Sequence, residues 1–552
     1  MIMYKVELQA RHWGWRQWLT LVVVILLVGV SSVFPASTGH AAAIGVTDNG
    51  STIIVNTGAG LVYTVNKDNG DITSSKMNGI ELSSSAGKGS HISSGLGSGA
   101  DVTWNTSPSG STVTIITKTS TLTHYYVSRS GENIIYMATY ITAEPSVGEL
   151  RYIFRGNGSV LTGVPVHSNI RNNTGAIESQ DVFGLSNGQT VSKYYGNDQA
   201  KDLSVRGVTG NGVGVFMAYG NREKSSGGPF FRDIQFQSGG DTEVYNYMNS
   251  VHEQTEDWRL GLHGPYALIF TTGSTPSVPD FSWMSGLGLT GWVSSRGAVV
   301  LNGLSGMVSG STYTIRFAND NAQYWTTASS SGAAVRRDMI PGTYTMTVYK
   351  GELGVYKESV NVTAGNTTTI NTRTISGDPA SKPALWRIGT WDGTPLEFLN
   401  GQTIAVRHPS DSRNASWGPV TYAVGGATNK FPAIQFRGQN SPTKITFTLT
   451  AAQASLPHVL NIGITAAYNN GRPSVTVNNT ILSNPAASTQ PNSRSFTIGT
   501  YRGNNTTFSW TIPASALVAG TNTISITPIS GSSDLGNWLS AGWVYDAVEL
   551  LN

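Results

Sequence analysis

The stretch Asn133-Ile-Ile-Tyr-Met-Ala-Thr-Tyr-Ile141 shows what kind of fold this sequence adopts. Most of its residues are β-branched or aromatic, and such side chains are enriched in strands because they pack well on a pleated surface. A glycine, Gly131, stands shortly before the run, where a turn is expected. The stretch therefore predicts a β-strand.

The same pattern continues on both sides, from Ile44 to about Thr272. Short runs that alternate or are rich in β-branched residues are separated by Gly, Asn and Ser, without a long amphipathic helical pattern. Other examples are Ser51-Thr-Ile-Ile-Val-Asn-Thr57, Leu61-Val-Tyr-Thr-Val65 and Ser111-Thr-Val-Thr-Ile-Ile-Thr117. A region of about 230 residues built in this way predicts an all-β fold that begins with a large antiparallel sandwich.

The composition supports this fold class and excludes some chemistry. The chain has 552 residues, of which 64 are glycines and only 12% are charged, a mixture typical of exported all-β proteins. It contains no cysteine, so it can form no disulfide, thiol nucleophile or thiolate metal site. Cysteine proteases and zinc ribbons are therefore excluded.

The N-terminus has the pattern of an export signal. Basic residues precede the apolar run Leu19–Val30, and the small residues Ala41-Ala42-Ala43 suit a signal peptidase. We expect residues 1–43 to be a signal peptide, with an uncleaved anchor as the alternative. The protein left after cleavage is nearly neutral, so recognition of an anionic partner must be local. We expect it to be secreted, to bind no nucleic acid and to have no membrane contact after cleavage.

Two segments rich in Ser and Pro, Gly273–Asp280 and Ser376–Pro383, read as linkers. They divide the chain into a first sandwich over residues 44–280, a second unit over 281–376 and a third over 384–552. The spacing of short strands in the second unit predicts a small immunoglobulin-like or prealbumin-like sandwich. It has no cluster of acids or imidazoles, so we expect it to be a spacer. The third has the length and composition of a sugar-binding jelly roll.

Aromatic and titratable residues gather between Asp241 and Pro265. Tyr245 and Tyr247 are two apart, so on a strand they point to the same face. His252 is an odd number of residues from Tyr245 and would face the other way on an unbroken strand. If the three side chains act together, the chain must turn at Met248-Asn-Ser250. The alternative is a half-buried aromatic strand followed by a surface histidine.

Two other segments of the first unit are dense in polar residues. Gly148–Arg155 presents Arg151 and Arg155 in a strand-like run, and Ser192–Asn197 places Lys193 beside two tyrosines. With these segments the sequence resembles the rhamnogalacturonan endolyases of polysaccharide lyase family 4. The matching phrases are Glu149-Leu-Arg, Ser192-Lys-Tyr-Tyr, Glu223-Lys-Ser-Ser-Gly-Gly-Pro-Phe-Phe-Arg232, Tyr245-Asn-Tyr-Met-Asn-Ser-Val-His252 and Arg259-Leu-Gly-Leu-His-Gly-Pro-Tyr266.

The resemblance extends over all three units and implies their folds. These are a galactose-mutarotase-like β-sandwich, a fibronectin-III-like or prealbumin-like middle domain, and a jelly roll similar to carbohydrate-binding modules. It also implies a polysaccharide lyase that cleaves rhamnose-(1→4)-galacturonate bonds of the rhamnogalacturonan-I backbone of pectin by β-elimination. Such an enzyme leaves an unsaturated galacturonate. We expect a monomer that needs no cofactor and no metal.

By similarity to the family, Lys193 and His252 are the catalytic pair. Elimination needs a base for the C5 proton of galacturonate and an acid for the leaving rhamnose oxygen. Lysine can serve as the base only if its pKa is lowered, whereas histidine already titrates near neutral pH. The resemblance implies Lys193 as base and His252 as acid, and the reverse assignment stays open.

Substrate binding is expected from three other residues that match the family. Arg151 is suited to grip the uronate carboxylate in a bidentate fashion, and Tyr245 and Tyr247 to position hydroxyls or stabilise charge. Arg155 is the alternative carboxylate clamp, or else half of a surface ion pair. His263 is expected to be structural, because the adjacent Gly-Pro suggests a rigid turn.

Two other functions remain open at this level. A hydrolase or epimerase on the same fold would use carboxylates, with Glu253 and Glu256 as candidates and Lys193 as an incidental residue. A non-catalytic, pectin-binding protein would keep the shape without the reaction. Only elimination creates an unsaturated uronate, so the products separate these alternatives.

Overall fold

The computed structural model describes residues 44–250, 252, 256–488, 497–499, 505–530 and 537–552. The expected signal peptide, residues 1–43, lies outside them, as does Glu253. No helix among the described residues is long and apolar enough to span a membrane. The described residues belong to one compact unit.

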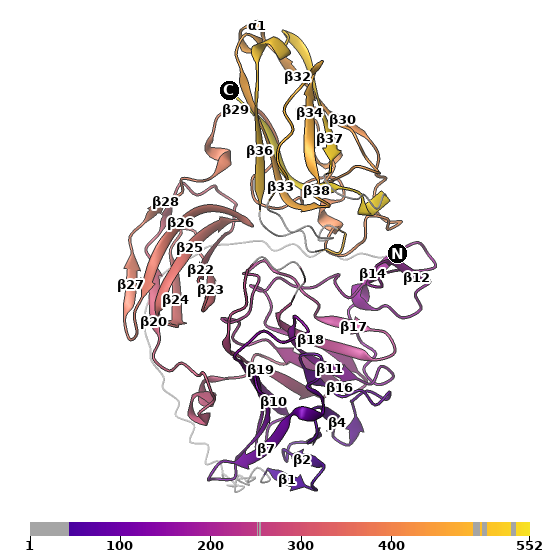
Figure 1. Cartoon of the computed structure of the whole chain (residues 1–552), viewed down its shortest axis with the longest axis vertical. Coiled ribbons are helices and arrows are strands. Elements are labelled where there is room, and N and C mark those ends of the chain that lie inside the picture. Colours follow the sequence, from indigo (N-terminus) through magenta and orange to yellow (C-terminus); the bar gives the residue numbers. More distant parts are fainter. Residues whose placement is uncertain (1–43, 251, 253–255, 489–496, 500–504, 531–536) are drawn as a thin grey trace, which may run out of the picture. The chain divides into compact units, whose positions relative to one another are not determined.

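The predicted all-β fold is confirmed (Figure 1). The only α-helix among the described residues is α1, Ala451–Ala454. Short 3₁₀ turns occur at η1 (Gly97–Gly99), η2 (Val166–Ser168), η3 (Ser282–Leu287), η4 (Pro379–Ser381), η5 (Gly401–Thr403), η6 (Thr428–Lys430), η7 (Ala514–Ala516) and η8 (Asn537–Leu539).

The N-terminal region, strands β1 to β19, is built around a seven-stranded sheet packed on a four-stranded sheet. The seven-stranded sheet has the order β15 (Val205–Gly210), β16 (Val213–Ala218), β19 (Gly261–Thr271), β10 (Ile134–Ile141), β9 (Leu122–Arg129), β8 (Thr112–Lys118) and β7 (Asp101–Thr106). The four-stranded sheet has the order β17 (Phe236–Ser238), β18 (Thr242–Asn249), β11 (Leu150–Gly156) and β6 (His91–Ile92).

Two further sheets complete this region. The five-stranded sheet contains β1 (Gly45–Asp48), β2 (Thr52–Asn56), β3 (Leu61–Asn66), β4 (Ile72–Met77) and β5 (Ile80–Glu81). The three-stranded sheet contains β12 (Gly175–Glu178), β13 (Val182–Gly184) and β14 (Thr190–Ser192). The five-stranded sheet adds Ile53, Val55 and Tyr63 to the core between the seven-stranded and the four-stranded sheet.

The strand predicted from Asn133 to Ile141 is confirmed as β10 in the middle of the seven-stranded sheet. One of its faces packs into the core between the two sheets through Ile135 and Met137. The other packs, through Tyr136, on the segment that follows β19, with Met284 as a neighbour. A strand covered on both faces is apolar along its whole length. This explains why the run is nearly continuous instead of alternating.

The middle region, β20 to β28, is a smaller sandwich. Its four-stranded sheet contains β23 (Gln323–Thr327), β22 (Tyr313–Ala318), β25 (Gly342–Lys350) and β26 (Leu353–Val362). Opposite it are β24 (Ala334–Met339), β20 (Gly297–Leu301) and β27 (Thr367–Ile370), and a separate pair is formed by β21 (Leu304–Ser305) and β28 (Arg373–Thr374). Val299, Ile315 and Met346 lie in the shared core.

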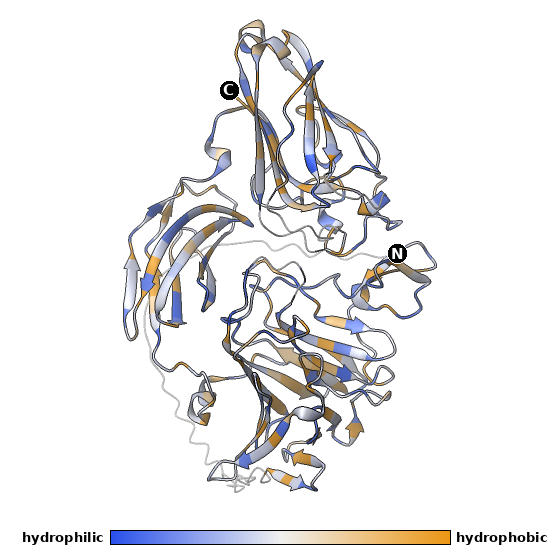
Figure 2. Ribbon diagram, viewed as in Figure 1, coloured by the Kyte–Doolittle hydropathy of each residue, from blue (hydrophilic) through white to orange (hydrophobic). Residues whose placement is uncertain are grey.

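The C-terminal region, β29 to β38, is a third sandwich, as predicted. One sheet contains β29 (Ala384–Gly389), β38 (Gly542–Leu551), β33 (His458–Tyr468) and β36 (Thr506–Ile512), with β31 (Ile434–Phe436) paired to β38. The other contains β30 (Val420–Ala423), β32 (Thr443–Leu449), β37 (Gly520–Ile529), β34 (Arg472–Val477) and β35 (Thr480–Ile481). Hydrophobic and hydrophilic residues alternate along many strands (Figure 2), as expected when one face meets a core.

The predicted break after Tyr247 is confirmed. In the pairing of β11 with β18, Leu150 lies opposite Asn249 while Arg151 lies opposite Tyr247, so Met248 is an extra residue. Strand β18 ends at Asn249, and the backbone N–H of His252 donates to Ser250 Oγ at 3.1 Å. A bulge followed by a turn redirects the chain, which removes the parity problem between the tyrosines and the histidine.

The rigid turn expected at Gly264-Pro265 is wrong, because both residues lie inside β19. The pairing of β10 with β19 shifts there: Met137 faces Tyr266 and Thr139 faces His263. Proline lacks the N–H that a regular ladder needs, so inside a sheet it is found at bulges or edges. The Gly-Pro pair marks a bulge between two buried strands.

Candidate active site

The outer face of the four-stranded sheet carries three of the expected side chains. Arg151 on β11 pairs across the strands with Tyr247 on β18 and donates to its hydroxyl oxygen. The guanidinium also forms a 2.7 Å ion pair with Glu149. Tyr245 stacks on Tyr247, with ring centroids 5.8 Å apart. Arg151 is thus held by a carboxylate and a phenol on one face of the sheet.

His252 joins this face through the turn after β18. Its ring centroid lies 5.3 Å from that of Tyr247 and 5.4 Å from that of Tyr194. Its Nδ1 is 3.0 Å from Asp233 Oδ1, and the other oxygen of Asp233 accepts from Ser250 Oγ at 2.6 Å. A carboxylate on Nδ1 fixes the tautomer and orientation of the imidazole. His252 Nε2 is therefore the ring nitrogen that is available for proton transfer.

Charges near the ring set the protonation of His252. Burial lowers its pKa, but the carboxylates of Asp233 and Glu149 raise it by more, and Lys193 lowers it. The net result is a pKa above the usual value for histidine. The cationic form is therefore favoured over more of the neutral range than in an exposed histidine.

Lys193 follows β14 directly and approaches the same place from a different sheet. Its ammonium lies 2.9 Å from Asp181 Oδ1 and 5.6 Å from the ring centroid of Tyr194, the residue that also packs on His252. About a quarter of the lysine side chain, 28%, is exposed, so it is reachable from solvent. The structure thus brings Lys193 and His252 against the same tyrosine ring, that of Tyr194.

Three other expected residues have partners within the fold. The Tyr245 hydroxyl donates to Glu243, and Arg155 forms an ion pair with the same carboxylate, so Arg155 is the ion-pair half that was the alternative to a clamp. His263 is buried with Nε2 3.0 Å from the Arg259 carbonyl oxygen, and burial lowers its pKa to about 3. The structural interpretation of His263 is confirmed.

Glu256 does not have the environment of a catalytic carboxylate. It forms ion pairs with Arg259 at 2.5 Å and Arg316 at 2.8 Å. Burial raises its pKa, but these two arginines outweigh burial and bring the pKa to about 2. A carboxyl group that stays ionised cannot donate a proton near neutral pH, so Glu256 is unsuited to general-acid hydrolysis.

Sequence reasoning missed Asp233 and Asp181, the carboxylates that contact the histidine and the lysine. Asp233 directly follows Arg232, the last residue of the Glu223–Arg232 phrase that matches the family, and that position was the available signal. Asp181 lies in the turn between β12 and β13. Its pairing with Lys193 depends on how the three-stranded sheet folds back, which no local pattern encodes.

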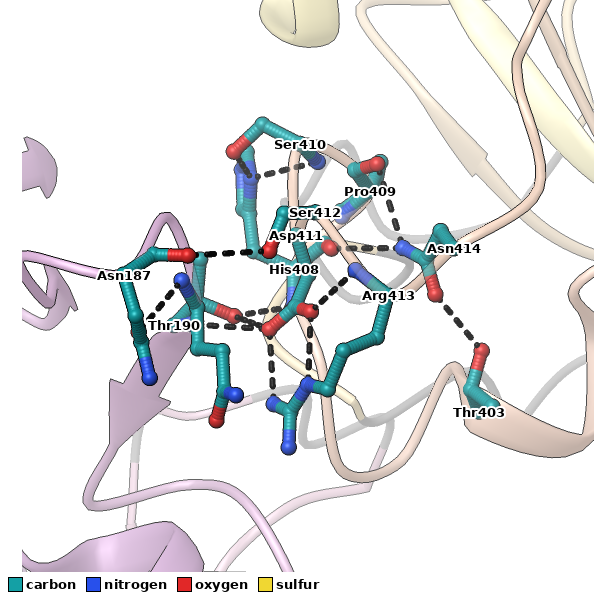
Figure 3. A network of polar contacts seen from close by, with 11 residues as sticks. Asn187, Thr190, Thr403, His408, Pro409, Ser410, Asp411, Ser412, Arg413 and Asn414 are labelled. Atoms are coloured by element: carbon teal, nitrogen blue, oxygen red, sulfur yellow. Dashed lines mark hydrogen bonds and ion pairs between the residues drawn. The ribbon is translucent and has the colours of Figure 1, made fainter.

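The C-terminal region contacts the three-stranded sheet that carries Lys193. One oxygen of Asp411 accepts from both the backbone N–H and the hydroxyl of Thr190, at 2.8 and 2.9 Å, and Arg413 holds the same carboxylate (Figure 3). His408 Nε2 lies 3.1 Å from Glu178 Oε2, and both side chains are buried. Residues from the C-terminal region therefore brace β12 and β14.

A second contact with that region lies closer to the aromatic side chains. The Tyr195 hydroxyl donates to the Thr497 carbonyl oxygen at 2.7 Å. Ile498 packs into the cluster that contains Tyr194, Tyr245 and Tyr247. The apolar floor of the site is therefore shared between two regions more than 200 residues apart in sequence.

Comparisons with known proteins match this architecture along the chain. The family described as rhamnogalacturonan lyase B, N-terminal, matches residues 44–291. Domain II of polysaccharide lyase family 4 matches residues 296–370, and domain III of that family matches residues 384–550.

Curated relatives are similar over nearly their whole length. A probable rhamnogalacturonate lyase A of Aspergillus fumigatus is 44% identical over 522 residues, covering 92% of this chain and 96% of the relative. The rhamnogalacturonate lyase A of Emericella nidulans is 44% identical with the same coverage. That of Aspergillus aculeatus is 43% identical, covering 94% and 98%.

Replacing Asp233 by asparagine tests what sets the charge of His252. Removing the carboxylate leaves burial, which lowers the pKa, less opposed, so the pKa of His252 should fall. NMR titration of the histidine ring protons measures this. Asp257→Asn, at an exposed position a few residues after His252, should leave the titration of His252 unchanged. An unchanged pKa in the Asp233 variant would show that another group controls the ring.

Replacing Asp411 by alanine tests whether the C-terminal region braces β14. The Thr190 amide loses a hydrogen bond to a charged acceptor, so amide exchange in the peptide containing Lys193 should become roughly tenfold faster. Hydrogen exchange with mass spectrometry provides the readout. Asp68→Ala, in an exposed turn, is the matched control. Equal exchange in both variants would mean that the contact does not hold the strand.

Proposed function

This chain belongs to polysaccharide lyase family 4, and we propose that it is a rhamnogalacturonan endolyase. Its substrate is the rhamnogalacturonan-I backbone of pectin, cleaved between rhamnose and galacturonate by β-elimination. The observation that carries the proposal is the clustering of Lys193, Arg151 and the Asp233-bound His252 around one aromatic floor. A base, an acid and a carboxylate-binding cation are the groups that elimination needs.

The proposed reaction begins at C5 of the galacturonate. The base removes the C5 proton, the electron pair forms the C4–C5 double bond, and the C4–O4 bond breaks. The acid donates a proton to O4, which leaves as the hydroxyl of the released rhamnose. Charge grows on the carboxylate beside C5 during this step, and the Arg151 guanidinium is suited to stabilise it. Tyr247, whose pKa burial raises, keeps its proton and can donate to a sugar oxygen.

We assign His252 as the acid and Lys193 as the base. The acid has to be protonated before the step, and the raised pKa of His252 meets that condition. Because Asp233 occupies Nδ1, the proton is delivered from Nε2. Lys193 is then the group that accepts the C5 proton, which an amine can do only in its neutral form. The 2.9 Å contact with Asp181 orients the lysine side chain.

Elimination is measured directly by ultraviolet absorbance, because the new double bond is conjugated with the carboxylate. We expect a signal on rhamnogalacturonan-I and not on homogalacturonan. Lys193→Ala and His252→Ala should each lower kcat by about 10²–10⁴-fold, the usual contribution of a general acid or base. Lys118→Ala, an exposed lysine on β8, is the control and should leave kcat unchanged.

The same assay separates the two alternatives. New reducing ends without absorbance would indicate hydrolysis, which the ion-paired state of Glu256 disfavours. Binding to rhamnogalacturonan without any cleavage would indicate a non-catalytic pectin-binding protein. Full activity in both alanine variants would refute the assignment of Lys193 and His252.

We further propose that residues 1–43 are removed as a signal peptide and that the secreted protein is a monomer without membrane contact. Its domains are taken as residues 44–280, 281–376 and 384–552. Family matches that begin at residues 44, 296 and 384 support this division. N-terminal sequencing of the exported protein and its sedimentation mass test the cleavage and the monomer.

A further inference from the structure

A cavity of about 690 Å³ lies between the N-terminal and middle regions. Its volume is in the range of small-molecule and sugar sites. Its lining includes Lys224 from the phrase Glu223–Arg232 and Arg222 directly before that phrase. It also includes Trp325 from β23 and Arg336 from β24. None of the five side chains expected in the active site lines it. It is therefore a separate feature of the molecule.

Arg222 brings a positive charge to this cavity without a carboxylate to bond to. Its two terminal nitrogens donate to Asn246 Oδ1 at 3.3 Å and to the Tyr247 carbonyl oxygen at 3.0 Å. Among the described residues, its buried Nε has no hydrogen-bond partner. Burial lowers the pKa of Arg222, and the charge of Asp233 raises it only in part. The guanidinium is bound only to neutral oxygens.

Lys224 is the second such cation. The side chain is buried, and its ammonium donates to the amide oxygen of Asn321. Within the described part of the chain it makes no ion pair shorter than 4.0 Å. The neighbouring Glu223 is already bound by Arg296 at 2.7 and 2.9 Å and by the Tyr324 hydroxyl at 2.6 Å. Burial accordingly lowers the pKa of Lys224.

Arg336 is the third of these cations in the cavity lining. Its guanidinium carbon lies 5.1 Å from the centroid of the Tyr324 ring, and its buried Nε lacks a hydrogen-bond partner in the described structure. Burial lowers its pKa, although Asp338 at the exposed rim of the cavity raises it. Among the described lining residues that make no ion pair, there are thus three cations, Arg222, Lys224 and Arg336, and one carboxylate, Asp338. The cavity therefore has an excess of positive charge. Desolvated charge of this kind is costly unless an anion offsets it.

The aromatic lining shows what kind of anion fits. Trp292 and Trp325 are partly exposed and line the same cavity. Indole rings present flat apolar faces that cover the C–H faces of sugars, while guanidinium groups bind carboxylates through paired hydrogen bonds. A ligand that uses both is a saccharide that carries carboxylates.

We propose that this cavity is a second binding site for a uronate-bearing stretch of polysaccharide, separate from the reacting site. The proposal rests on the proposed function only for the choice of saccharide. It changes the role expected for the middle region, which would contribute Trp325 and Arg336 to substrate capture instead of acting as a spacer. It also gives Lys224, one residue of the Glu223–Arg232 phrase, a role in binding.

The test is calorimetric titration of the full-length protein with a short oligogalacturonate, which has uronates but no rhamnose. Arg336→Gln should weaken binding about tenfold or more, because it removes a charge-assisted contact. Arg337→Gln, an exposed neighbour that does not line the cavity, should bind as the wild type does. Trp325→Ala, which removes no charge, should also weaken binding. This second variant keeps the test valid if the arginine variant misfolds.

Two further titrations distinguish between the classes of ligand that the cavity could bind. An uncharged galactan oligosaccharide should not bind, and inorganic phosphate should bind far more weakly than the oligogalacturonate. Equal affinity for phosphate, equal affinity for galactan, or wild-type affinity in both cavity variants would each overturn the proposal.

Activity separates this proposal from the proposed function. Arg336→Gln should raise KM for the polymer while kcat on a fragment too short to span both sites stays unchanged. A wild-type protein that binds oligogalacturonate in this cavity but gives no absorbance on rhamnogalacturonan would refute the lyase assignment alone. Loss of kcat on the short fragment in Arg336→Gln would refute a separate site.

Discussion

The two-residue period of β18 is the constraint on which the site depends. Val244 and Met248 point into the core between the seven-stranded and the four-stranded sheet, while Tyr245 and Tyr247 point outward. Burial of the inner side chains fixes the strand's register, and this fixes where Arg151 meets Tyr247. The bulge at Met248 then lets the chain leave the sheet so that His252 returns to the tyrosine face. The packing of the core therefore also determines the geometry of the site.

Opposite charge balances distinguish the two places where a saccharide is proposed to bind. Around His252, two carboxylates outweigh burial and favour the protonated ring. In the cavity beside the middle region, burial outweighs the available carboxylates, and Arg222 and Lys224 make no ion pair within the described part of the chain. The first balance suits proton delivery, and the second suits an anion that arrives from outside. The residues that flank the Glu223–Arg232 phrase take part in one place each: Asp233, directly after it, contacts His252, and Arg222, directly before it, lines the cavity.

Much of the fold and part of the site were predictable from local patterns. The strand over residues 133–141, the common face of Tyr245 and Tyr247 and the break before His252 follow from strand periodicity alone. Lys193 was identified only through the family resemblance, because a lysine after a short strand carries no local signal. The turn expected at Gly264-Pro265 was wrong, since glycine and proline mark bulges as well as turns.

The sequence by itself determined the all-β class, the succession of three sandwiches and the residue types available for chemistry, because these depend on side-chain alternation and composition. Only the tertiary structure decided which charges meet. The pairs Asp233–His252, Asp181–Lys193 and Glu178–His408 join residues 19, 12 and 230 positions apart. Their contacts arise from how sheets pack and fold back on each other, and a pattern confined to neighbouring residues carries no record of that.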